Sequence, residues 1–249
     1  MNATPKQQTL TLIAIALTFG SGSADVASFT RLGSVFTSVM TGNIVLWGLA
    51  VARGSLSLAS HTAVAVGGYV AGVAVGTWVA HGARAASSGS SGSSGQEGML
   101  PGHVLWVLLG ELTLLAGFAV GWEVSGASPA GWAQFGLLAT LAAAMGVQSS
   151  AVNDMGIAQV STTYLTGTLT GLVSSLVKPG QDTPHGIRRF GVLLGLVTGA
   201  ILCGVFVATA ADVVPALPLA ALVTTLVLAA GPGGRRPHLR ARARARARE

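Results

Sequence analysis

The stretch FGVLLGLVTGAILCGVFVAT, residues 190–209, runs for twenty residues without a charged side chain. An α-helix of that length rises about 30 Å, which matches the thickness of the hydrocarbon core of a bilayer. Such an uncharged stretch is typical of a helix that crosses a membrane. The segment therefore predicts an integral membrane protein.

The composition of the whole chain supports this class. Charged residues make up only 9% of the 249 residues, and hydrophobic residues make up 51%. Soluble domains usually carry about 25% charged residues, because a surface that faces water must be polar. Most of the net charge of +6 comes from the arginines of a basic tail, residues 232–249. We expect this tail at the cytoplasmic surface beside anionic lipids, and we expect no nucleic acid partner.

Seven further hydrophobic segments surround the first one, and each predicts a helix. The eight segments lie at about residues 9–27, 33–52, 59–79, 103–120, 131–152, 161–177, 190–209 and 213–230. The predicted fold class is an all-α polytopic transmembrane bundle, with a single membrane domain over residues 1–231. A Ser/Gly-rich stretch, residues 85–98, predicts a flexible loop because it has few apolar side chains to anchor it.

Repeated motifs indicate an internal duplication into residues of about 9–123 and 130–231. Glycines spaced by four occur in two segments, and 123 positions separate the two sets: Gly68, Gly72 and Gly76, then Gly191, Gly195 and Gly199. Two Thr-Gly pairs, which end at Gly42 and Gly167, lie 125 positions apart. Small residues on one helix face let another backbone come close. We expect the six spaced glycines to pack helices within the chain, and contact between chains in a homo-oligomer is the alternative.

The number of membrane crossings stays open at this point. Segments two and six are interrupted by polar residues, so they either cross the membrane or enter and leave on one side. Eight crossings make the two halves parallel repeats, whereas six make them inverted repeats, as in several transporter folds. Both arrangements place both termini on the cytoplasmic side under the positive-inside rule.

Polar residues gather where one segment ends and the next begins, in both halves of the chain. Irregular backbone at membrane depth survives only where protein shields it or where it lines a wet cavity. One interpretation is a substrate pathway between the two clusters, and the other is that the hydroxyl groups cap helices and bond across an interface. The predicted pathway residues are Asp25, Thr41, Gly42, Asn43, Glu111, Gln148, Asn153, Tyr164, Thr166, Gly167 and Thr168.

Two carboxyl groups lie within apolar surroundings. Glu111 sits eight residues into its segment, where inserting a charge costs about 2.5–3.5 kcal/mol or more, so it should face protein or water. It is either a proton carrier or a protonated side chain bonded to a neighbouring helix. Asp25 lies near the end of the first segment; if it is buried we expect it to pair with Arg31 or to share a proton, and if it lies near the headgroups it is an ordinary cap. We interpret His61 and Arg53 as anchors at the membrane surface.

The motifs of common enzymes are missing from the sequence. It contains no HExxH, no CxxC, no GxxxxGK[ST] and no GxSxG pattern, which are the signatures of zinc, redox, nucleotide and hydrolase sites. Its single cysteine, Cys203, cannot form an intrachain disulfide. We therefore predict no enzyme, no catalytic residues, no cofactor and no metal.

Two sets of motifs resemble the YoaK family of bacterial membrane proteins, whose function is unknown. The first half holds Asp25-Val-Ala-Ser-Phe, Val35-Phe36 and Met40-Thr41-Gly42-Asn43, and the second holds Gly146-Val-Gln148 and Thr163-Tyr164-Leu165-Thr166-Gly167-Thr168. The resemblance covers nearly the whole chain and implies a multi-pass protein of the bacterial inner membrane. It implies no substrate and no site residue.

Two functions remain from the residues themselves. Duplication, interrupted helices and a buried carboxyl group favour a transporter or permease for a small solute or ion, with proton coupling through Glu111 or Asp25. The alternative is a membrane scaffold or accessory protein that transports nothing. Besides the lipid bilayer, the candidate partners are a small-molecule or ion substrate and further copies of the chain in a homo-oligomer.

Overall fold

The computed structural model describes residues 4–88, 100–155, 165–177 and 183–231, and within these ranges all regular structure is helical. Six helices are long and apolar enough to cross a membrane. They are α1 (Pro5–Arg31), α3 (Leu56–Ser88), α4 (Gly102–Val124), α5 (Gly131–Asp154), α7 (Thr183–Thr209) and α8 (Ala216–Ala230). The prediction of an all-α polytopic bundle is confirmed.

Two helices are much shorter than these six spans, the last of which runs over Ala211–Ala230 and includes the turn before α8. Helices α2 (Met40–Ala52) and α6 (Leu165–Val177) have thirteen residues each, so each rises only ~20 Å and is too short to span the hydrocarbon core. A short 3-10 turn, η3 (Ala211–Val213), lies between α7 and α8. The structure thus favours six crossings over eight.

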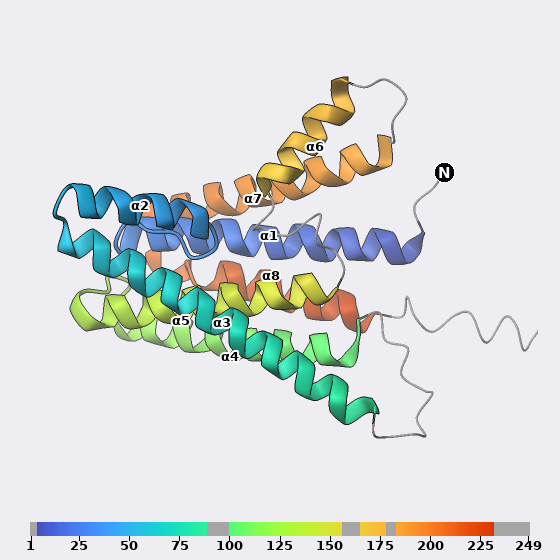
Figure 1. Cartoon of the computed structure of the whole chain (residues 1–249), viewed down its shortest axis with the longest axis horizontal. Coiled ribbons are helices and arrows are strands. Elements are labelled where there is room, and N and C mark those ends of the chain that lie inside the picture. The colour runs from blue at the N-terminus through green and yellow to red at the C-terminus, as the bar shows by residue number, and fades with distance from the viewer. Residues whose placement is uncertain (1–3, 89–99, 156–164, 178–182, 232–249) are drawn as a thin grey trace, which may run out of the picture.

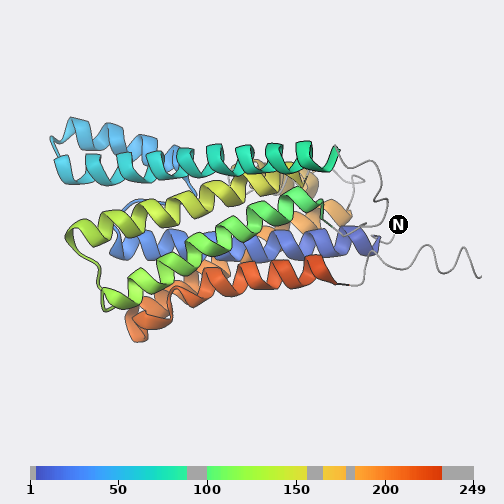
Figure 2. The ribbon, with the colours of Figure 1, turned by 90° about the horizontal axis from the view of Figure 1, so that it is seen from below.

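The long helices lie side by side along one axis (Figures 1 and 2). Helix α1 begins and α8 ends at one end of this axis, which we call the terminal end. At the other end, which we call the opposite end, α2 turns into α3, α4 into α5, and α7 into α8. Figure 1 places α2 in the half of the bundle toward the opposite end and α6 in the half toward the terminal end.

Helices α1 and α5 form the centre of the bundle. Helix α1 packs against α7 and α8, α5 packs against α3 and α4, and the two central helices also touch each other. In their most apolar stretches α1 buries 61% and α5 buries 67% of the residues, against 22% for both α3 and α7. The outer helices expose apolar side chains instead, as expected for surfaces that face lipid.

Glycines allow the closest helix contacts. A Cβ on Gly72 of α3 would lie 2.1 Å from the carbonyl oxygen of Ala143 in α5, and a Cβ on Gly199 of α7 would lie 2.1 Å from that of Phe19 in α1. The other four spaced glycines also meet atoms of α5 or α1. All six therefore pack helices within one chain, through van der Waals contact between backbones.

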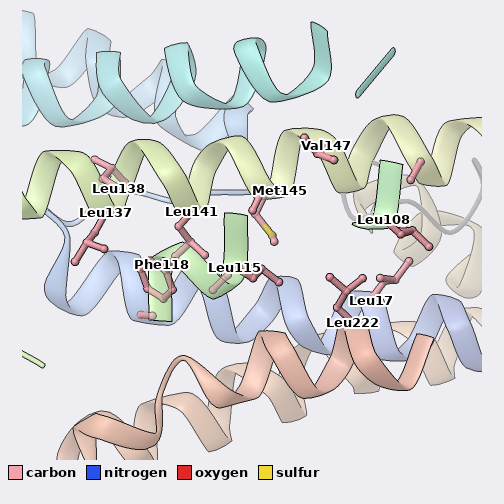
Figure 3. Packing of buried hydrophobic residues seen from close by; sticks show 14 of the residues in the cluster. Leu17, Leu108, Leu115, Phe118, Leu137, Leu138, Leu141, Met145, Val147 and Leu222 are labelled. Atoms are coloured by element: carbon pink, nitrogen blue, oxygen red, sulfur yellow. The ribbon is translucent and has the colours of Figure 1, made fainter. Parts of the chain in front are cut away.

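The apolar core fills the space between α1, α4, α5 and α8 (Figure 3). Its largest fully buried side chains include Trp122 and Phe118 of α4, whose rings lie 5.6 Å apart. The indole N–H of Trp122 donates to the carbonyl oxygen of Ala211 at 2.8 Å. This bond satisfies a polar group that would otherwise be costly among apolar atoms.

Several segment boundaries differ from the predictions. Helix α1 starts earlier than expected, at Pro5, because Thr4 and Gln7 form a capping box before it. Helix α3 continues to Ser88, so residues 85–88 of the predicted loop are helical and the prediction was wrong there. The rest of that loop and the basic tail, residues 232–249, lie outside the described residues. The two-repeat division stays a prediction.

Candidate functional site

Asp25 fastens the segment between α1 and α2 to the interior of the bundle. Its Oδ1 accepts hydrogen bonds from the backbone N–H groups of Thr37 and Ser38, both at 2.8 Å, and from the Thr37 hydroxyl at 3.2 Å. Its Oδ2 accepts from the Ser38 hydroxyl at 2.6 Å. Because Asp25 lies six residues before the end of α1, these bonds draw the following segment back along α1 before α2 begins.

Of the two alternatives for a buried Asp25, the pairing with Arg31 was wrong, and the sharing of a proton stays a prediction. Asp25 is buried, with 7% of its surface exposed, but backbone and hydroxyl donors surround it. The Arg31 guanidinium instead donates to the carbonyl oxygen of Val207 at 3.1 Å and to the Ser128 hydroxyl at 3.3 Å. Hydrogen bonds from neutral donors can compensate a buried carboxylate as a cation would.

The Thr-Gly-Asn motif completes the same turn. The Asn43 side chain pairs with the backbone of Phe36: its Nδ2 donates to the carbonyl oxygen at 2.6 Å, and its Oδ1 accepts from the N–H at 2.9 Å. Asn43 is fully buried, whereas Thr41 is exposed on the surface of α2. A Cβ added to Gly42 would lie 3.4 Å from the Phe36 ring. The asparagine therefore holds the irregular segment in place, and the threonine does not face it.

The corresponding motif of the second half is only partly described. Thr166 and Gly167 are exposed near the start of α6, and Thr168 is buried with 2% of its surface exposed. Tyr164 lies outside the described residues. Asn153 is exposed at the end of α5. The predicted pathway residues thus occupy several surfaces of the bundle, and the pathway itself stays a prediction.

A hydrogen-bonded pair joins the two central helices. The Ser21 hydroxyl of α1 donates to Oε1 of Gln148 in α5 at 3.0 Å, and Nε2 of Gln148 donates to the carbonyl oxygen of Leu17 at 3.2 Å. Both side chains are buried. Gly22 and Gly146, beside this pair, each lie close to the backbone of a further helix, α7 and α3 respectively. The contact between the two central helices, α1 and α5, therefore includes a buried polar pair.

Glu111 is a buried carboxyl group on α4. Only 1% of its surface is exposed, and its Oε2 has no hydrogen-bond partner within the described part of the chain. An unpaired buried oxygen of this kind is costly and rare, and in membrane helices such carboxyl groups often mark proton or ion pathways. Within the described part of the chain, no hydrogen bond gives the Glu111 Oε2 atom a role in holding the fold together.

Two polar networks were missed by the sequence reasoning. At the opposite end, the His61 ring contacts the carbonyl oxygen of Ser57 and Oε1 of Gln134, and Gln134 donates to the carbonyl oxygen of Arg31 at 2.8 Å. His61 is buried, so its interpretation as a surface anchor was wrong. Its ring also takes the space that any side chain at Gly33 would need, and Gly33 has a φ of 100°.

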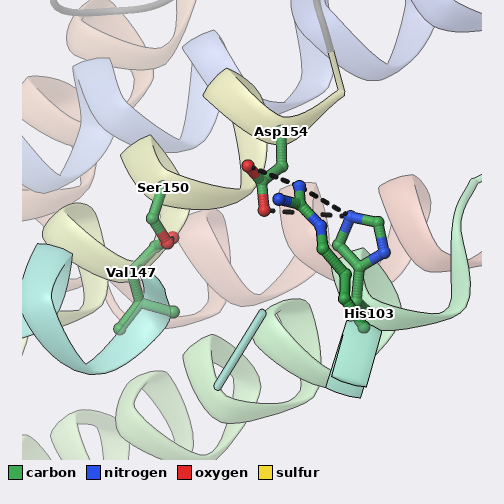
Figure 4. A network of polar contacts seen from close by, with 5 residues as sticks. His103, Val147, Ser150 and Asp154 are labelled. Atoms are coloured by element: carbon green, nitrogen blue, oxygen red, sulfur yellow. Dashed lines mark hydrogen bonds and ion pairs between the residues drawn. The ribbon is translucent and has the colours of Figure 1, made fainter. Parts of the chain in front are cut away.

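The second missed network lies at the terminal end (Figure 4). Nη2 of Arg84 in α3 lies 2.9 Å from Oδ1 of Asp154 in α5, and the His103 ring of α4 approaches both residues. These three residues come from three separate helices, and neither spacing nor composition in the sequence signals their contact. The sequence indicated only that each of the three residues lies near the end of a predicted helix.

The remaining observations point to no other chemistry. No group of three His, Cys, Asp or Glu side chains that could hold a metal occurs in the described ranges. A surface groove between α3 and α4 is lined by apolar and small residues: Trp78, Val79, Gly82, Ala83 and Trp106. None of the predicted pathway residues contributes to that lining.

Comparison with known proteins agrees with this picture of a membrane bundle. A family model described as "Protein of unknown function (DUF1275)" matches residues 13–230. The chain belongs to the DUF1275 family. The UPF0700 transmembrane protein YoaK of Bacillus subtilis (strain 168) is 31% identical over 156 residues, which are 63% of this chain and 62% of that protein. No solved structure matches the chain significantly. The match confirms the resemblance to the YoaK family and identifies this DUF1275 protein as an integral membrane protein.

Proposed function

We propose that this DUF1275 protein is a transporter or permease for a small solute. The observation that carries the proposal is the pair of short helices, α2 and α6, which stand among six spans of at least twenty residues. Their places toward opposite ends of the bundle (Figure 1) fit inverted repeats that each contribute one half-helix. Half-helices in transporters leave free backbone groups at membrane depth, where these groups can hold a solute or an ion.

The helix contacts support the inverted repeat. If α1 corresponds to α5, α3 to α7 and α4 to α8, the pairing of α1 with α7 and α8 matches the pairing of α5 with α3 and α4. The same correspondence matches the contact of α2 with α3 to that of α6 with α7. Three long helices in each half give the halves opposite orientations in the membrane.

The pathway in this proposal runs beside the contact of α1 with α5, the two central helices. Ser21 and Gln148 supply polar groups there, and Glu111 on the neighbouring α4 supplies a carboxyl group. A carboxyl group that is shielded from water can carry a proton during a transport cycle. We infer that Glu111 couples solute movement to protons, while Asp25 of α1 holds the segment of residues 32–39 in place.

Reconstituted vesicles test the proposal. The full chain is placed in liposomes that contain the pH dye pyranine, and gradients of potassium acetate, urea and glycerol are applied in turn. We expect one of these solutes to cause shrinkage, swelling or a pH change faster than in protein-free vesicles. Glu111→Gln should abolish the pH change that accompanies solute movement. Glu123→Gln changes an exposed acid on the same helix and should leave this pH change intact. Rates equal to those of protein-free vesicles for all three solutes would overturn the proposal.

A membrane scaffold that transports nothing is the second candidate. The observation that favours it is that Thr41 and Thr166 are exposed on separate helices, while the bonds of Asp25, Asn43 and Gln148 all hold the chain itself together. Under this reading the chain serves as a partner for other membrane proteins or for further copies of itself. The vesicle experiment separates the two functions directly.

We further propose that the protein lies in the bacterial plasma membrane with both termini in the cytoplasm. Among the described residues, Lys6, Arg84, Arg188 and Arg189 lie toward the terminal end, and Arg31 and Arg53 lie at the opposite end. The positive-inside rule then places the terminal end in the cytoplasm. A fluorescent protein fused to the C-terminus should glow, and an alkaline phosphatase fusion there should be inactive.

A further inference from the structure

One ion pair closes the terminal end of the bundle. Arg84 lies near the end of α3 and Asp154 is the last residue of α5, and their side chains meet at 2.9 Å. The His103 ring lies 3.1 Å from Arg84 and 3.8 Å from Asp154 (Figure 4). The pair therefore joins two helices that also pack through Gly68, Gly72 and Gly76.

A different bond closes the opposite end. Arg31 is the last residue of α1, and its Nη2 donates to the carbonyl oxygen of Val207 near the end of α7 at 3.1 Å. Helices α1 and α7 also pack through glycines, at Gly191, Gly195 and Gly199. Each end of the bundle thus has one arginine that bridges the ends of a glycine-packed helix pair.

The two bridges occupy matching positions of the sequence. The interval from Arg31 to Asp154 is 123 residues, and the interval from Arg84 to Val207 is also 123 residues. The same interval separates Gly68 from Gly191. Arg31 in α1 corresponds to Asp154 in α5, and Val207 in α7 corresponds to Arg84 in α3. The donor therefore lies on α3 in the first bridge and on α1 in the second, so the roles of donor and acceptor are exchanged between the halves.

We propose that the Arg84–Asp154 pair and the Arg31–Val207 bond are equivalent gates, one at each end of the bundle. When one gate opens, the ends of its two helices separate while the other gate stays closed. This inference rests on the proposed transport function for its purpose, but the separate opening of the two ends is a property of the fold that can be measured without any solute.

The gates differ in chemistry, and this difference makes the proposal testable. The terminal gate joins two opposite charges, whereas the opposite gate joins a charge to neutral acceptors, the carbonyl oxygen of Val207 and the Ser128 hydroxyl. Neutralising Arg84 leaves Asp154 without the guanidinium, so the terminal end should open. Neutralising Arg31 leaves only neutral acceptors behind, the Val207 carbonyl group and the Ser128 hydroxyl, and should affect the opposite end alone.

Spin labels at matching positions report on each gate. Ala85 and Asn153 are exposed beside the terminal gate, and Thr30 and Ala208 are exposed beside the opposite gate at the same interval of 123. Each pair is changed to cysteine in a Cys203→Ala background, and electron–electron resonance in lipid nanodiscs gives the distance distribution. Arg84→Gln should lengthen and broaden the distribution for residues 85 and 153 and leave that for residues 30 and 208 unchanged.

Three controls make the outcome decisive. Arg31→Gln should have the reverse pattern, Arg84→Lys should keep the short distance, and the exchange Arg84→Asp with Asp154→Arg should restore it. Unchanged distributions for both label pairs in Arg84→Gln, or a change in both together, would overturn the gates. Separate opening of the ends in a protein that fails the vesicle test would leave the gates in place and reject only the transport function.

Discussion

The backbone of Gly72 in α3 lies so close to Ala143 in α5 that a Cβ on the glycine would come within 2.1 Å of the alanine carbonyl oxygen. A contact this short cannot hold any side chain, so the two helices must separate if one is added. The partner atom is backbone in a central helix, which can yield only by moving the helix. The close distance between α3 and α5 therefore depends on the absence of a side chain at position 72.

Gly72→Ala should destabilise the protein for this reason. Overpacking of a close helix contact usually costs about 1–3 kcal/mol, which corresponds to a fall in melting temperature of roughly 2–4 °C per kcal/mol for a chain of this size. The matched control is Gly67→Ala on the same helix, where a Cβ meets nothing within 4 Å. Melting followed by tryptophan fluorescence in detergent compares them, and an equal effect of both changes would contradict the prediction.

The Asp25 carboxylate should hold residues 32–39 in their folded position. Asp25→Asn places an amide among four donors, so at least one of them loses its acceptor and the segment loosens. Ser38→Ala removes a single donor and should have a smaller effect. Hydrogen–deuterium exchange of the peptide that covers residues 32–43 measures this, and equal exchange in Asp25→Asn and the unchanged protein would show that the bonds do not hold the segment.

Ser21 and Gln148 should jointly stabilise the contact of α1 with α5. A double-mutant cycle with Ser21→Ala and Gln148→Leu isolates their interaction, and side-chain hydrogen bonds inside membrane proteins average about 0.6 kcal/mol, with a maximum near 1.7 kcal/mol. Unfolding in mixed micelles of detergent and dodecyl sulfate supplies the free energies. Strict additivity of the two single changes would mean that the bond contributes nothing beyond packing.

Glu111→Gln should fold as well as the unchanged chain. The replacement keeps the shape of the side chain and removes the need to bury an ionisable group whose Oε2 is unpaired within the described residues. Glu111→Lys is the contrasting variant, because it brings a new charge into the same apolar surroundings. We expect a normal melting temperature for the first variant and a strong loss of folded protein for the second. A large loss for Glu111→Gln would make the carboxyl group a part of the fold and remove it as a proton carrier.

The six-crossing topology predicts that Arg53 and Asp212 lie on the same side of the membrane. In an eight-crossing chain they would lie on opposite sides, because the second segment would carry Arg53 across. Single cysteines at these positions in a Cys203→Ala background can be tested with an impermeant maleimide on intact cells. We expect both positions to react alike. Labelling of only one of them would show that the second segment crosses the membrane and would contradict the six-crossing topology.

The sequence by itself determined that this is an all-helical membrane protein and located its segments. Low charge and long apolar stretches such as residues 190–209 leave lipid as the only suitable surroundings, and in lipid the helix is one of the few structures that satisfy the backbone. The role of the six spaced glycines in helix packing also followed from their spacing, because residues four apart share one face of a helix.

Only the tertiary structure decided how far the short helices reach and which polar groups meet. Hydropathy could not show that residues 32–39 fold back along α1, because the bonds to Asp25 depend on a turn and not on a periodic pattern. It could not bring Arg84 to Asp154 either, since these residues lie on different helices and meet only once α3 has packed on α5. Local physics therefore fixes the elements of this protein, while contacts between distant helices fix the places where a function can reside.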